Sequence, residues 1–140
     1  EEAIYIYRRD FKPSASLAEP YFMLAANVFA ADSDAEGAFL RTSMQQAFAR
    51  MRTGTRGKLP RPVKDIDAEI GQAVRRGVDQ MLRVTAVGSA ETVRGQLSEM
   101  IAKYQPDEMI LTGQIHDHAA RMRSFEIAAE VMAGLQAAAA

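Results

Sequence analysis

The sequence predicts an α/β fold made of parallel βα units. The main evidence is residues 84–125, which read as strand, turn, helix, loop, strand, turn and helix. Short apolar runs alternate there with apolar residues at helical spacing, and a strand, a helix and a strand in this order form a βαβ unit. The two strands of such a unit run parallel, with a right-handed crossover. The preceding residues repeat the pattern with an insertion, so we expect one sheet with helices covering its sides.

The composition is that of a globular domain without disulfides. The chain has 140 residues, a net charge of −1, 48% hydrophobic residues and 25% charged residues. This charge gives no general attraction to nucleic acids or anionic membranes, so neither is expected as a partner. The absence of cysteine excludes a disulfide framework, a thiolate metal site and a cysteine nucleophile.

The two ends of the sequence bear on location and completeness. No apolar run of about 18 residues and no signal-peptide pattern are present, so we expect a cytoplasmic protein. The chain starts at Glu1, within a helical pattern and without methionine. We interpret it as a fragment of a longer protein.

The first part of the chain is expected to hold a helix, a strand and a second helix. Apolar residues at helical spacing predict a helix at the start, and Pro13 ends it. Residues 20–31 are apolar on both faces, which is typical of a buried parallel strand. Ser33 opens a capping-box pattern that begins the next helix, which ends before Gly54.

An insertion at about residues 50–82 follows, within what we interpret as a single partial domain, residues 1–140. Residues 50–64 form a basic loop without acidic residues, and residues 65–82 carry apolar residues at the spacing of one helix. The loop is either a clamp for a phosphate or acidic partner or a solvated surface loop, and blocks of like charge favour the second reading. Its basic residues are Arg50, Arg52, Arg56, Lys58, Arg61 and Lys64.

The first candidate site is the end of a strand predicted over residues 84–87. Gly88 and Ser89 follow this strand and precede a helix that stops at Pro106. Backbone amides at the start of a helix attract an anion such as a phosphate. Ser89 also suits the ordinary role of N-cap, which residue type alone favours.

The second candidate site is the segment His116, Asp117 and His118, at the end of a strand predicted over residues 108–115. Alternate residues of an extended turn point to opposite sides and no third ligand is evident, so no metal site is predicted. Residue type favours Asp117 as the N-cap of the last helix and the histidines as packing or hydrogen-bonding groups. His116 is the best candidate for a catalytic role at a ligand mouth. Asn27, within the first apolar strand, either faces a ligand or bonds to neighbouring backbone.

Common nucleotide and hydrolase motifs are absent. The sequence has no glycine-rich dinucleotide fingerprint, no phosphate loop and no nucleophile elbow. The residues by themselves therefore do not identify a reaction.

Several short segments form a series that extends over nearly the whole chain. They are residues 20–23, 27–28, 30–34, 87–93, 107–110 and 115–126, which read PYFM, NV, AADSD, VGSAETV, DEMI and IHDHAARMRSFE. Together they resemble the C-terminal part of the luciferase-like, flavin-dependent monooxygenases. The resemblance implies that the chain supplies the last three strands and helices of a TIM barrel. It also implies an oxidation of a small organic substrate by oxygen and reduced flavin mononucleotide (FMN), with a flavin reductase as a partner.

The resemblance suggests candidate site residues and a partner for the chain. Asn27, Gly88 and Ser89 become candidate cofactor-binding residues, and His116 remains the weak catalytic candidate. Three strands cannot close a barrel and leave two unpaired edges and an apolar face. We therefore expect either a missing N-terminal barrel half or a second copy of the chain, as in a homodimer, and we expect the isolated chain to be inactive. The alternative is a non-catalytic, flavin-free half-barrel or interaction domain that functions by homo-association.

Overall fold

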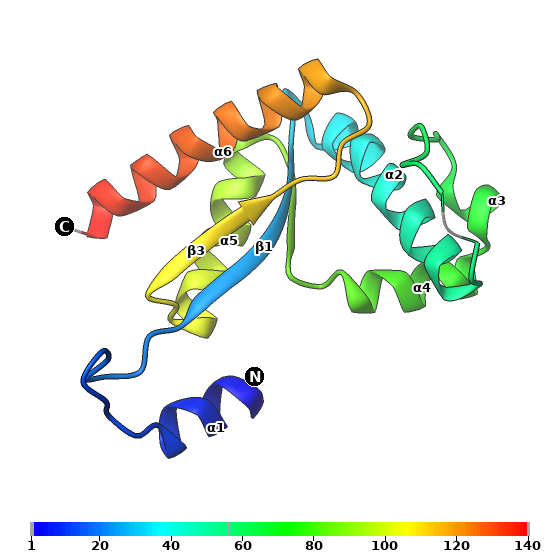
Figure 1. Cartoon of the computed structure of the whole chain (residues 1–140). Helices are drawn as coiled ribbons and strands as arrows, with labels where there is room; N and C mark the ends of the chain where they lie inside the picture. Colours follow the sequence, from blue (N-terminus) through cyan, green and yellow to red (C-terminus); the bar gives the residue numbers. More distant parts are fainter. Residues whose placement is uncertain (1, 56, 140) are drawn as a thin grey trace.

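The structure is a computed structural model that describes residues 2–55 and 57–139 (Figure 1). The elements, in chain order, are α1 (Glu2–Asp10), β1 (Met23–Ala30), α2 (Asp34–Arg52), α3 (Ile66–Ile70), α4 (Gln72–Met81), β2 (Thr85–Gly88), α5 (Ala90–Tyr104), β3 (Glu108–Thr112) and α6 (His118–Ala139). Among the helices described, none is long and apolar enough to cross a bilayer. The predicted alternation of strands and helices is confirmed.

The three strands form one parallel sheet in the order β2-β1-β3. The carboxyl half of β1 pairs with β2, from Asn27 opposite Thr85 onward, and its amino half pairs with β3, up to Asn27 opposite Thr112. The prediction that β2 and β3 are parallel is confirmed. They are not neighbours, however, because the longer β1 lies between them. β2 pairs with one edge of β1 and β3 pairs with the other.

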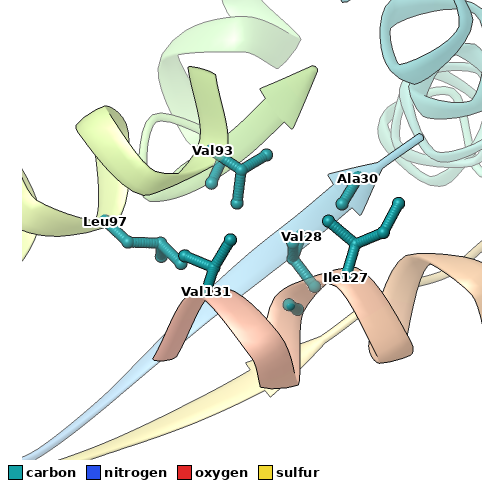
Figure 2. Packing of buried hydrophobic residues seen from close by; sticks show 8 residues of the cluster. Val28, Ala30, Val93, Leu97, Ile127 and Val131 are labelled. Carbon is teal, nitrogen blue, oxygen red and sulfur yellow. The ribbon is translucent and has the colours of Figure 1, made fainter. Parts of the chain in front are cut away.

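One face of the sheet is covered by α5 and α6 (Figure 2). Val28 and Ala30 of β1 point to this face, where Leu97 of α5 and Val131 of α6 meet them. The fully or almost fully buried members of this cluster are Val28, Ala30, Ala86, Val93, Leu97, Ile127, Ala128 and Val131. These side chains fix α5 and α6 to the sheet. Burying each valine, leucine or isoleucine among them stabilises the fold by about 1.5–3 kcal/mol.

The opposite face is covered only near the carboxyl ends of the strands. Phe29 is fully buried there, in a second cluster with residues of α2, α4 and the segment after β3. Towards the amino end none of the described helices covers the same face, as the exposure of Met23 (45%) and Ile110 (43%) shows. We call this surface the open face; it carries Met23, Ala25, Asn27, Thr85, Glu108, Ile110 and Thr112.

The insertion differs from the single helix that was predicted over residues 65–82. It contains two helices, α3 and α4, which are separated at Gly71. The single-helix prediction is wrong because Gly71 has a φ of 78°, outside the helical region, and caps the end of α3. Arg75 on α4 then forms ion pairs with Asp67 on α3 and with Asp79, which holds the two helices together.

Helix α1 lies apart from the sheet and is joined to the body by few contacts (Figure 1). The predicted helix is confirmed, but it has no buried residue. Its Arg8 donates to the carbonyl oxygens of Tyr104, at 3.3 Å, and of Gln105. A cation at the C-terminus of α5 compensates carbonyl groups that have no partner within the helix.

Candidate functional site on the open face

A row of polar side chains crosses all three strands on the open face. Asn27 in the central strand stands opposite Thr85 of β2 and Thr112 of β3. Its Nδ2 donates to Thr85 Oγ1 at 3.3 Å, and its Oδ1 accepts from Thr112 Oγ1 at 3.1 Å. The prediction that Asn27 bonds to backbone or faces a ligand is therefore refined, because its protein partners are two threonine hydroxyl groups.

The polar row lies between apolar surfaces. On the amino side, Ala25 and Ile110 are exposed on the same face, and on the carboxyl side Phe29 is buried under the second cluster. Thr112 is exposed and Asn27 is partly buried, so the row borders solvent at the limit of the covered region. A few convergent polar groups on an apolar surface are typical of small-molecule sites.

The turn between β2 and α5 is closed by a carboxylate of the same chain. The Ser89 amide donates to Asp34 Oδ1 at 2.7 Å, and Ser89 Oγ accepts from the Thr92 amide as the N-cap of α5. The N-cap role of Ser89 is confirmed. A phosphate at this helix start would have to displace Asp34, and the assignment of Gly88 and Ser89 to cofactor binding stays a prediction.

The environment of Asp34 favours its charged form. The pKa of Asp34 is lowered, first by the hydrogen bond from the Ser89 amide and then by bonds from the Thr92 and Ser89 side chains. Ser33 caps α2 one residue earlier, with its Oγ accepting from the Glu36 amide at 3.2 Å. The start of α2 is thus bound to the start of α5, which fixes the carboxyl ends of β1 and β2.

Two glycines allow these elements to approach so closely. A Cβ at Gly37 of α2 would lie 2.7 Å from both the Gly88 nitrogen and the Phe29 oxygen. Gly88 itself has a φ of 134°, which disfavours other residues. The Gly88 position is therefore required for backbone conformation and packing, whatever it binds.

The turn between β3 and α6 is more open. Asp117 Oδ1 accepts from the Ala120 amide at 2.8 Å, which confirms its predicted N-cap role. His118 Nδ1 lies 2.8 Å from an Arg121 nitrogen, and the His116 side chain is exposed. Within residues 2–55 and 57–139, no group of three or more His, Asp or Glu side chains is placed to hold a metal ion. The catalytic assignment of His116 stays a prediction.

Sequence reasoning missed the role of Ser124. Its side chain is fully buried, and its Oγ accepts a hydrogen bond from the Ala30 amide at 2.9 Å. The preceding residue, Arg123, forms an ion pair with Asp32 at 3.0 Å. These contacts fix α6 to the end of β1, and the signal that could have found them is a serine, Ser124, on the same helical face as the apolar Ile127 and Val131.

A second polar site lies between the insertion and α2, centred on the Asp79 carboxylate. Asp79 accepts from Arg41 at 2.8 Å, from Gln45 at 2.6 Å and from Arg75 at 3.0 Å. Among the predicted basic-loop residues, Arg61 offers its carbonyl to Gln46, and Arg56 lies outside the described residues. Lys58 and Lys64 are exposed, in keeping with the solvated-loop reading.

Comparison with known proteins relates the chain to one family. It is 43% identical over 130 residues to a luciferase-like monooxygenase of Escherichia coli strain K12, a match that covers 93% of this chain and 39% of the relative. It is 37% identical over 129 residues to the uncharacterized protein YvbT of Bacillus subtilis, covering 92% of this chain and 38% of that protein. No family model matches the sequence.

The fold is also found in a solved structure. The crystal structure of apo-MsnO8 superposes with a TM-score of 0.74 at 27% identity, over 94% of this chain and 40% of that one. The chain therefore spans about two fifths of the length of the proteins it matches. With the open parallel sheet, this confirms the predicted α/β fold as part of a barrel that is incomplete in this chain.

Proposed function

The chain corresponds to a segment of a luciferase-like protein, and from this premise we propose that it forms part of a flavin-dependent monooxygenase. The reaction would oxidise a small organic substrate with oxygen and reduced FMN. A flavin reductase as the source of reduced flavin and a cytoplasmic location belong to the same proposal. The chain contributes one wall of the site rather than all of it, because it spans 39% of its E. coli relative.

The observation that supports this proposal most is the polar row on the open face. Thr85, Asn27 and Thr112 lie side by side, next to the exposed apolar side chains of Ala25 and Ile110. A flavin ring has flat apolar faces and a polar pyrimidine end, so the surface fits both parts of it. The ring would lie against the apolar side chains and direct its polar edge to Asn27.

The phosphate of FMN fits this chain less well than the ring. The helix start at Ser89 is the expected anion position, and its amide already donates to the Asp34 carboxylate. A second negative charge there would repel Asp34. We infer that the phosphate is held by residues outside this chain, and that Gly88 and Ser89 hold the carboxyl end of β2 in place through the bond to Asp34.

The chain's own residues would bind and orient the reactants. When bound, reduced flavin supplies the electrons for the reaction with oxygen. Asn27 would orient the ring through hydrogen bonds, and the second cluster, which contains Phe29, would exclude water from the carboxyl side of the row. His116 is exposed after β3, next to Ile115 of the second cluster, and its role as a proton donor or acceptor for the substrate stays a prediction.

A titration with FMN tests the proposal. The protein containing this chain is titrated into FMN while flavin fluorescence is recorded, and the variant Asn27→Leu is titrated in parallel. We expect saturable quenching that weakens about tenfold or more in the variant, as follows from losing hydrogen bonds of about 1 kcal/mol each. Equal binding by both proteins would remove Asn27 from the site, and no binding would count against the enzyme proposal.

A non-catalytic domain that functions by homo-association is the second candidate. It is favoured by the open face, where Met23 and Ile110 are 45% and 43% exposed, and by the adjoining Tyr21, which is 47% exposed. A second copy of the chain would cover these side chains and the outer edge of β3; the outer edge of β2 is already occupied at Val87 by the Gln96 side chain. Size-exclusion chromatography with light scattering checks this: a folded monomer of 15.4 kDa would exclude the homodimer.

A further inference from the structure

We propose that the carboxamide of Asn27 binds a ligand edge in which a carbonyl group stands beside an N–H group, as in a cyclic imide. The proposal deepens the function proposed above and, where the ligand is a flavin, rests on it, because the pyrimidine end of a flavin carries this edge. The proposal is based on the hydrogen bonds that the Asn27 side chain makes and on the donor and acceptor that remain unused.

The orientation of the Asn27 amide is fixed by its neighbours. Thr85 Oγ1 donates to the carbonyl oxygen of Leu82 at 2.5 Å, so its single hydroxyl hydrogen is used. Towards Asn27 it can therefore only accept, which requires Nδ2 on the side of β2. On the side of β3 the Thr112 hydroxyl must donate, because Oδ1 can only accept.

These bonds leave one donor and one acceptor on the same amide. A carboxamide has two N–H hydrogens and two carbonyl lone pairs, and the flanking threonines use one of each. Since both threonines stand beside Asn27 in the strand register, the bonds to them run sideways across the sheet. The remaining N–H and lone pair lie at the outer end of the amide, next to each other, above the open face.

A donor and an acceptor in this arrangement recognise a complementary pair. Asparagine carboxamides bind the edges of nucleobases in this bidentate manner. The ligand must offer a carbonyl to the free N–H and an N–H to the free lone pair. Only one N–H remains at the outer end of the amide, and its neighbour is an acceptor, so the chain distinguishes this edge from one that carries two carbonyls.

The surface around Asn27 suits a flat ligand. Ala25 is exposed two residues earlier on the same face of β1, and Ile110 lies opposite Ala25 on β3. A planar ring bonded to Asn27 would cover these apolar side chains, and the apolar area removed from water would add about 25 cal/mol per Å² to binding. The polar edge and the apolar platform together select a cyclic ligand over an open-chain amide.

Two matched pairs of probes test the inference. Lumiflavin is compared with 3-methyllumiflavin, and 1-methyluracil with 1,3-dimethyluracil; in each pair the methyl group replaces only the N–H between two carbonyls. Binding is followed by calorimetry for the flavins and by NMR titration for the uracils. We expect a preference of about tenfold or more for the N–H form, since one hydrogen bond and the steric fit are lost on methylation.

Three variants assign the preference to residues. Asn27→Leu is expected to abolish it, and Thr112→Val to reduce it several-fold, because the amide then loses a bond that holds its orientation. Thr53→Val is the control: Thr53 is an exposed threonine at the end of α2 whose hydroxyl donates to the Arg50 carbonyl, remote in sequence from the sheet. It should bind all probes as the wild type does.

The outcomes separate this inference from the proposed function. A preference in both pairs that disappears with Asn27→Leu supports both. A preference for 1-methyluracil without flavin binding supports the imide edge and overturns the flavin function. Flavin binding that is equal for lumiflavin and 3-methyllumiflavin, or a preference that survives Asn27→Leu, overturns the imide edge alone. Binding of none of the probes overturns both.

Discussion

Alternate residues of β1 meet opposite environments on the two faces of the sheet. Val28 and Ala30 are completely buried under α5 and α6, whereas Met23 and Asn27 lie on the open face. The covered face has apolar side chains that only pack, and the open face has a polar row that fixes one amide in position. A single strand thus supplies stability on one side of the sheet and a candidate binding surface on the other.

The largest expected effect is on the covered face. Leu97 is fully buried between α5 and the sheet, so Leu97→Ala should lower the free energy of unfolding by about 2–5 kcal/mol. Met23→Ala, on the open face, should change it by less than about 0.5 kcal/mol because Met23 is already half exposed. Urea denaturation of both variants measures the difference, and equal losses would mean that the open face is covered in solution.

The next effect comes from the contact between α2 and the strand ends. Gly37→Ala should destabilise the protein by about 1–3 kcal/mol, because the new Cβ would lie 2.7 Å from backbone atoms of Gly88 and Phe29. Gly95→Ala is the matched control within α5, with nothing within 4 Å of its Cβ. It should stabilise the protein by about 0.5–1 kcal/mol through helix propensity. A stabilising Gly37→Ala would show that the helix stands further from the sheet.

Ser124→Ala should lower the free energy of unfolding by as much as Gly37→Ala or by less. The substitution leaves the buried Ala30 amide without its acceptor, which costs about 1–3 kcal/mol. Ser98→Ala, at an exposed position of α5, should be neutral within about 0.5 kcal/mol. Thermal unfolding followed by circular dichroism compares the two, and a neutral Ser124→Ala would place another acceptor at Ala30.

The smallest effect depends on pH. The folded-state pKa of Asp34 is lowered, so its hydrogen bonds to the Ser89 region contribute stability above its unfolded pKa of about 3.9. This contribution is lost as pH falls through the lower, folded-state pKa. The urea midpoint of the wild type should therefore exceed that of Asp34→Asn at pH 7 and converge towards it near pH 3. A constant difference at all pH values would argue that Asp34 stays ionised or is unbound throughout.

Local features could be predicted from the sequence, and long-range ones could not. The caps at Ser33, Ser89 and Asp117 follow from residue type and from the first turn of each helix, and all are confirmed. The break at Gly71 was missed because a glycine within a helical pattern signals either a weak helix or its end. Neighbouring residues do not decide between these two.

The site depended on contacts that periodicity does not encode. Asp34 and Ser89 are 55 residues apart, and the order of the strands places β1 between β2 and β3. Asn27 stood out as a polar residue in an apolar strand, but its threonine partners follow only from the strand register. The sequence could thus indicate Asn27 as a candidate without indicating what orients it.

Two isoleucines, one on the open face and one packed against the covered face, allow the most direct test of the central claim that the open face binds the ligand. Ile110 of β3 is 43% exposed, and Ile127 of α6 is 3% exposed in the cluster between α6 and the sheet. With isoleucine methyl groups labelled for NMR, a titration with FMN should shift the Ile110 signal and leave Ile127 unchanged. An unchanged Ile110 signal, or a larger shift at Ile127, in a sample that binds FMN would contradict the account.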